Sequence, residues 1–60
     1  MTSYEAEQKV KELLKEKGLR YSRAYPAFEG GVRVIGVEPN GRERRFSFTR
    51  DENNVYLEEM

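Results

Sequence analysis

Few side chains in this 60-residue sequence could do covalent chemistry, because histidine and cysteine are both absent. The hydroxyls of Ser3, Ser22 and Ser47 have no imidazole to activate them as nucleophiles. The adjacent carboxylates of Glu58 and Glu59 would point to opposite faces of a strand, so they do not converge into an acid–base pair. We therefore predict a protein that is not an enzyme.

Motifs for cofactors and metals are also missing. "EGGVRVIG" lacks the glycine spacing of a dinucleotide fingerprint, and no helix is predicted after it. The acidic segment 51–54 lacks the ligand number and glycine spacing of a calcium loop. We expect neither a cofactor nor a metal, and one helix on one sheet leaves no cleft of the few hundred Å³ or so that a small-molecule site needs.

Arginine and aromatic side chains could instead bind a partner through a contact surface. All seven arginines lie between positions 20 and 50, whereas all four lysines lie in the first 17 residues. The last ten residues hold four acidic side chains and no basic one, so the 11 basic and 11 acidic residues balance only overall. This distribution fits either solvated sheet faces or a basic contact surface.

The length allows at most one domain, spanning residues 1–60. A chain of this size buries only about 60 % of the surface that it exposes when unfolded, so its stability is marginal. Its apolar runs are far shorter than the ~20 residues that cross a bilayer, and its first residues carry no apolar signal-peptide core. We expect a soluble chain with no membrane partner.

The strongest predicted element is a helix over residues 3–17. Thr2 and Glu5 have the spacing of a capping box, and Gly18 stands where a left-handed C′ residue belongs. With Leu14 as C3, Leu19 becomes C″, and their contact would complete a Schellman stop. One apolar stripe with a period of 3.6 residues is formed by Ala6, Val10, Leu13 and Leu14. This stripe can cover one face of a sheet and little else.

The segment 32–50 predicts a β-hairpin whose register can be derived. A two-residue loop would place Glu38 opposite Glu43, which opposes like charges. A three-residue loop fits a type I turn with Gly41 in the left-handed bulge position and places Glu38 opposite Arg42. It also forms two cross-strand pairs worth roughly 0.2–1 kcal/mol each, Val34 with Phe46 and Val32 with Phe48. We therefore predict the bulged turn.

This register divides the hairpin into two faces. The side toward the helix holds Val32, Val34, Phe46 and Phe48. The other side holds Arg33, Ile35, Val37, Glu43, Arg45, Ser47 and Thr49. Because the helix is the only second layer that the chain can form, we expect Ile35 and Val37 to face water or a partner.

The last residues predict a fourth strand over 55–59. A turn at 51–54, whose asparagines tolerate left-handed backbone, pairs Arg50 with Val55. Val55 and Leu57 then join the helix side, and Tyr56 joins the other side. The whole chain predicts an α+β fold, in which one N-terminal helix packs on a four-stranded antiparallel meander. The predicted strands cover residues 19–28, 32–38, 42–50 and 55–59.

The sequence does not decide which face of the sheet the side chains of the first strand occupy. Gly30 and Gly31 mark a turn, but a two- or four-residue loop turns Tyr21 and Tyr25 toward the helix, whereas a three-residue loop at 29–31 turns them away. Pro26 cannot donate to a ladder, which favours a sheet edge or a bulge. The favoured arrangement has Leu19 and Tyr21 inward, an irregularity near Pro26, and Tyr25 or Phe28 partly exposed.

These faces predict a protein-binding module. Exposed apolar groups rimmed by charge mark contact surfaces, and tyrosine and arginine are enriched at binding hot spots. The predicted contacts lie on the sheet face opposite the helix and in the segment 25–28: Tyr25, Phe28, Arg33, Ile35, Val37, Arg45 and Tyr56. The expected partner is a protein target, and the same face could instead form a homodimer.

Two alternatives stay open. Arginines interleaved with aromatic side chains on a sheet are also typical of single-strand nucleic-acid binders, although zero net charge and the acidic tail argue against that partner. A scaffold made only to fold would explain the clean helix ends and the 39–41 turn. Such a scaffold would avoid Pro26 within a strand.

Two resemblances follow from these features. "EAEQKVKELLKEKG" resembles the helix of a computationally designed mini-protein, with its lysine and glutamate surface, apolar core positions and glycine stop. The absence of cysteine, histidine and tryptophan is similar to that class. A regular helix and hairpin beside an irregular aromatic segment resembles a de novo designed binder, which implies a non-enzymatic protein engaging a chosen protein target.

The order of elements also resembles a PepSY-type small domain, with its "NG" turn, "RRFSF" strand and terminal "VYLEE". That family usually has Thr-Gly in the last turn, where this chain has Asn53 and Asn54. This resemblance implies inhibition or regulation of a partner, which is again a binding role.

Overall fold

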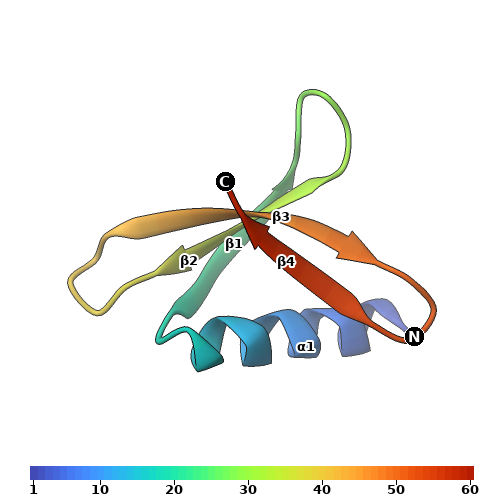
Figure 1. The fold of residues 1–60 in the computed structure, drawn as a ribbon, viewed down its shortest axis with the longest axis horizontal. Helices are drawn as coiled ribbons and strands as arrows, with labels where there is room; N and C mark the ends of the chain where they lie inside the picture. The colour runs from blue at the N-terminus through green and yellow to red at the C-terminus, as the bar shows by residue number, and fades with distance from the viewer.

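A computed structural model describes all residues from 1 to 60. The elements are α1 (Ser3–Glu16), β1 (Arg20–Pro26), β2 (Val32–Val37), β3 (Glu43–Arg50) and β4 (Val55–Glu59). The strands form one antiparallel sheet in the order β1-β2-β3-β4, and α1 lies across one face of this twisted sheet (Figure 1). The predicted α+β fold is confirmed.

Both ends of α1 are fixed by the hydrogen bonds that the sequence predicts. The Glu5 N–H donates to Thr2 Oγ1 at 3.1 Å, and the Thr2 N–H donates to Glu5 Oε1 at 2.9 Å. Gly18 has a φ of 77°, and the Leu19 N–H donates to the Leu14 carbonyl at 2.9 Å. The helix therefore begins with a capping box and ends in a Schellman motif.

The single helix, α1, is too short and too polar to cross a membrane.

The core lies between α1 and the inner face of the sheet, which is the face toward the helix. Its buried members are Ala6, Val10, Leu14, Leu19, Val34, Phe46 and Val55. Gly36 lies where the helix end comes closest to β2, because a Cβ placed there would lie 3.0 Å from Leu14 Cδ2 and 3.2 Å from Leu19 Cβ. A larger residue at position 36 would push these leucines out of the core.

The β2–β3 connection is the predicted bulged turn. The Gly41 N–H donates to the Glu38 carbonyl and the Glu38 N–H donates to the Arg42 carbonyl, both at 2.8 Å. Gly41 has a φ of 90°, the left-handed bulge position. The predicted pairing of Val34 with Phe46 and of Val32 with Phe48 is confirmed.

The β1–β2 connection, whose loop length the sequence left open, repeats the same three-residue turn. The Gly30 N–H donates to the Ala27 carbonyl at 3.1 Å, and the Ala27 N–H donates to the Gly31 carbonyl at 3.0 Å. The three-residue loop is therefore 28–30 rather than 29–31, and β1 ends at Pro26 instead of residue 28. The offset arises because Gly30, with a φ of 99°, takes the bulge position.

The sequence predicted an irregularity of the first strand near Pro26, and this was wrong. The irregularity of β1 lies at Ser22. Tyr21 pairs with Gly36 and Arg23 pairs with Ile35, so one extra residue is inserted between them. This bulge reverses the alternation of side chains along the strand. Tyr21 therefore faces the helix as expected, whereas Tyr25 lies opposite Arg33 on the other face.

The β3–β4 turn has the predicted register, with Arg50 opposite Val55 and Phe48 opposite Leu57. The asparagines of this turn do not adopt the left-handed backbone that they tolerate, because only glycines have positive φ values. The Asp51 side chain stabilises the turn instead. Its Oδ1 accepts the backbone N–H groups of Asn53 and Asn54, both at 2.8 Å, and these bonds lower the pKa of the Asp51 carboxyl.

Candidate protein-binding surface

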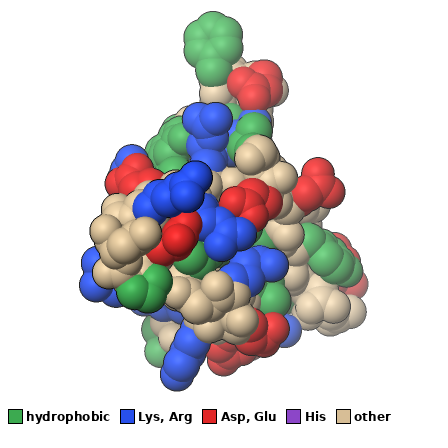
Figure 2. Space-filling model, turned by 60° about the vertical axis from the view of Figure 1, so that its left-hand side comes forward, with side chains coloured by type: hydrophobic (Ala, Val, Ile, Leu, Met, Phe, Trp, Pro, Cys, Tyr) green, Lys and Arg blue, Asp and Glu red, His purple; other side chains and the backbone are tan.

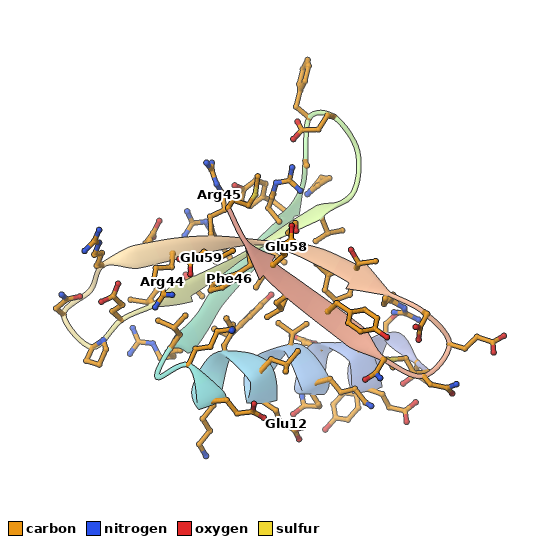
Figure 3. The ribbon with its side chains drawn as sticks, viewed as in Figure 1. Glu12, Arg44, Arg45, Phe46, Glu58 and Glu59 are labelled. Carbon is orange, nitrogen blue, oxygen red and sulfur yellow. The ribbon has the colours of Figure 1, made fainter.

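The outer face of the sheet, on the side away from α1, carries every predicted contact residue except Phe28. It consists of Arg20, Arg23, Tyr25, Arg33, Ile35, Val37, Glu43, Arg45, Ser47, Thr49, Tyr56 and Glu58. Figure 3 shows the alternation, with Arg45 and Glu58 above the sheet and Arg44 below it, toward the helix. Arg44 bonds Glu59 there, with its Nε 2.8 Å from Glu59 Oε2.

Ile35 lies on the outer face as predicted, but the expectation that it faces water or a partner was wrong. Only 4 % of its surface is exposed, although it is not part of the core under α1. Its cross-strand neighbours are Arg23 and Arg45, whose long aliphatic stems can lie over an adjacent side chain. These two arginines are the neighbours best placed to bury Ile35 on this face.

An ion pair also crosses β2 on this face. The Arg23 guanidinium reaches from β1 to Glu43 on β3, with N···O distances of 3.0 and 3.3 Å. Val37 lies opposite Glu43 and is half-buried. The hydrogen bonds from Arg23 lower the pKa of the Glu43 carboxyl, although both side chains are about half exposed and the pair stabilises the fold only weakly.

Arg33 connects the outer face to the end of the β1–β2 hairpin. Its side chain is only 14 % exposed and lies between Tyr25 on β1 and Ser47 on β3. Its guanidinium donates to the Glu29 carboxylate in the adjoining loop. Arg33 is therefore not free to contact a partner, because its ion pair with Glu29 holds the loop against the sheet.

The hairpin tip, residues 27–31, carries the most exposed large hydrophobic side chain of the molecule. Phe28 has a relative exposure of 105 %, so no part of the chain covers its ring. The tip projects beyond the rest of the sheet (Figure 1), and Figure 2 shows a hydrophobic side chain standing clear at the end of the molecule. The two backbone hydrogen bonds of the turn fix the position from which the ring projects.

Tyr56 does not join this group. It lies on β4, whereas Tyr25 lies on β1 at the opposite edge of the sheet. Two strands separate them, which corresponds to about 14 Å at the usual strand spacing. The Tyr56 hydroxyl donates to the Asp51 carboxylate at 3.2 Å. Hydrophobic surface is accordingly broken into small separate areas among charged groups, as Figure 2 shows for one side.

Arg20 and Arg45 are the outer-face cations left free. Both are exposed, and neither has a carboxylate within 4 Å. The predicted contact set therefore separates into an exposed aromatic tip with Tyr25 at its base, and a covered centre at Ile35 with Arg45 beside it. Arg20 and Arg23 were not predicted as site residues, because their facing depends on the bulge at Ser22, which no residue pattern signals.

An apolar hollow of about 200 Å³ opens on the inner face, between the first half of α1 and the β1–β2 hairpin. It is lined mainly by Ala6, Val10, Tyr21, Ala24, Val32 and Phe48, with Glu7 and Arg50 at its rim. The hollow exists because one helix cannot cover the whole twisted sheet. Its volume lies below the roughly 300–1,000 Å³ of typical small-molecule sites.

Neither face of the sheet carries a metal-binding group. No three acidic side chains converge into a group that could hold a metal ion. No protein-family model, curated protein or solved structure matches the chain. The conclusion about function therefore depends on the hairpin tip and the outer face themselves.

Proposed function

We propose that this chain is a non-enzymatic protein-binding module that uses the hairpin tip as its anchor. The observation that carries this proposal is the complete exposure of Phe28 on a hydrogen-bonded turn. An aromatic ring held in this way loses little conformational freedom on binding, which makes it an effective anchor. A ring with no contact inside its own chain also contributes nothing to folding, so stability does not account for it.

The charges of the outer face, which continues from the tip along the sheet, indicate the surface that would receive it. The outer face carries four arginines and two glutamates, an excess of two positive charges. Glu43 is occupied by Arg23, whereas Arg45 and Arg20 have no carboxylate partner. A complementary partner therefore offers an apolar pocket for Phe28 and, farther along the outer face, carboxylates that meet Arg45 (opposite Ile35) and Arg20 (opposite Val37). Tyr25, at the base of the tip, adds a second aromatic contact.

Selection of ligands against the whole chain tests this proposal. A phage-displayed random-peptide library is panned on the immobilised protein, and the enriched peptides are measured by interferometry against variants. We expect binding of most peptides to fall at least tenfold with Phe28→Ala. The matched control is Tyr4→Ala, which removes an aromatic side chain of 71 % exposure from α1. Peptides that tolerate Phe28→Ala as well as Tyr4→Ala would refute the proposal.

Nucleic acid is the alternative partner, since arginines and tyrosines share the outer face. Two of its four arginines, Arg23 and Arg33, are already bonded to glutamates. We therefore expect no binding of single-stranded oligonucleotides at physiological salt. Binding with a steep salt dependence would favour that partner instead. A chain with no partner would show neither oligonucleotide binding nor Phe28-dependent peptides.

The proposed role agrees with what both resemblances imply. Designed binders and PepSY-type domains would each engage a protein partner rather than transform a substrate. Membership of either class stays a prediction, and the proposal above does not depend on it.

A further inference from the structure

The molecule carries both an uncovered aromatic ring and an unfilled apolar hollow. Phe28 lies at the hairpin tip, and the hollow lies at the base of the same hairpin on its inner face. We propose that two copies of this chain exchange their tips, so that Phe28 of each copy fills the hollow of the other. This inference rests on the proposed function, because it names a second copy of the chain as the partner of the hairpin tip.

The size of the hollow fits a phenyl ring. An engineered cavity of about 150 Å³ lined by aliphatic and aromatic side chains binds benzene, and this hollow has about 200 Å³ with a similar lining. Seven of its ten lining residues are hydrophobic, so water gains few hydrogen bonds there. An apolar ring is therefore a better occupant than water.

One pair of charges at the two surfaces is complementary, because Glu7, the other charged residue at the rim, already pairs with Lys11 at 3.8 Å. Glu29 follows Phe28 directly, and its carboxylate is 68 % exposed although it accepts a bond from Arg33. Arg50 stands at the rim of the hollow and has no carboxylate within 4 Å; it donates only to the Met1 carbonyl. Insertion of Phe28 would bring Glu29 of one copy toward Arg50 of the other, where opposite charges attract.

Reciprocal exchange also gives a closed assembly. A tip that enters the hollow of a second copy, while receiving that copy's tip, produces a two-fold symmetric dimer with two identical contacts. One-way insertion would instead leave a free tip and a free hollow at the ends of a growing chain. We therefore expect dimers and not larger species.

The test uses the 60-residue chain and two variants that each remove one half of the contact. Phe28→Ala removes the ring and leaves the hollow, whereas Ala24→Leu fills the hollow and leaves the ring. Neither change disturbs the core, since Phe28 contacts nothing and Ala24 borders empty space. Thermal melts of both variants at low concentration establish that they fold.

Sedimentation velocity over about a hundred-fold concentration range that reaches millimolar protein measures the association. We expect the parent chain to dimerise and each single variant to stay monomeric. Loss of one anchor typically costs on the order of 30-fold in affinity, so loss of two costs on the order of 1,000-fold. A mixture of the two variants should recover part of the dimer, because one ring and one hollow remain to meet.

A direct observation completes the test. In a mixed sample of differently labelled copies, nuclear Overhauser contacts should connect the Phe28 ring of one copy with the Val10 and Val32 methyl groups of the other. A parent chain that stays monomeric would overturn the exchange but leave the proposed function intact, since the peptide selection is independent of it. A dimer that persists in Phe28→Ala would overturn the exchange as well, and would indicate another interface.

Discussion

The substitution Ile35→Ala distinguishes a covered outer face from an exposed one. Ile35 is only 4 % exposed, yet no layer of secondary structure covers it. Substituting a buried isoleucine by alanine costs about 2–5 kcal/mol. The side chains of the neighbouring arginines are flexible and can move into the space that the isoleucine leaves. We therefore expect a loss of unfolding free energy at the low end of this range, about 2 kcal/mol. For a domain of this size that lowers the Tm by roughly 8–16 °C.

The assay is urea unfolding followed by far-UV circular dichroism, with a thermal melt beside it. Thr49→Ala is the matched control, because Thr49 is an exposed, β-branched residue on the same face. That control reports strand propensity alone, a scale that spans about 1 kcal/mol. The excess cost of Ile35→Ala over Thr49→Ala then measures burial by the side chains around it.

Two further variants test what covers Ile35. Arg23→Ala removes both the charge and the stem, whereas Arg23→Met keeps an unbranched stem without the charge. We expect Arg23→Met to retain most of the stability that Arg23→Ala loses, because burial by the stem outweighs an exposed ion pair. An Ile35→Ala cost no larger than that of Thr49→Ala would refute the reasoning and show that the arginines do not close over Ile35 in solution.

Other perturbations test the core, the helix contact and the charges. Phe46→Ala should cost roughly 3–5 kcal/mol, which unfolds most of a marginal domain, since Phe46 is 1 % exposed; a native circular dichroism spectrum would contradict this. Gly36→Ala should cost roughly 1–3 kcal/mol in urea unfolding, because the added Cβ lies 3.0 Å from Leu14 Cδ2; an unchanged midpoint would show that the helix end yields. Acid should destabilise the fold, because Glu43 and Asp51 have lower pKa values folded than unfolded and the folded state binds fewer protons. Their contribution is complete above the unfolded pKa values, about 4 to 4.5, and is lost as the pH falls through the lower folded pKa values. The Tm should therefore fall as the pH is lowered below about 4.5; a flat profile would contradict it.

The elements with local signals were predictable. The helix ends depend on residues within four or five positions of one another, such as Thr2 with Glu5 and Leu14 with Leu19, so their spacing alone determines the hydrogen bonds. The β2–β3 register follows from one three-residue turn, since a turn type determines which residues face each other. The fold class and the inner face of β2, β3 and β4 were therefore determined by the sequence.

The first strand was only partly predictable. The two adjacent glycines predicted a turn, but either of them could occupy the left-handed bulge position. In the structure Gly30 occupies it. The bulge at Ser22 then reverses the alternation, and no pattern of residue types marks it. Because side chains alternate with a period of two, each such shift exchanges the faces for every residue beyond it.

What the sequence by itself determined was the layout of one helix on one sheet, and with it the conclusion that Ile35 stands on the side without a helix. Only the tertiary structure decided that Ile35 is buried there, because it places Arg23 and Arg45 on either side of Ile35 and joins Arg23 to Glu43 across β2. It likewise decided that Phe28, and not the centre of the sheet, is left without contacts. Burial depends on neighbours brought together by pairing between strands, and those neighbours are distant in the sequence.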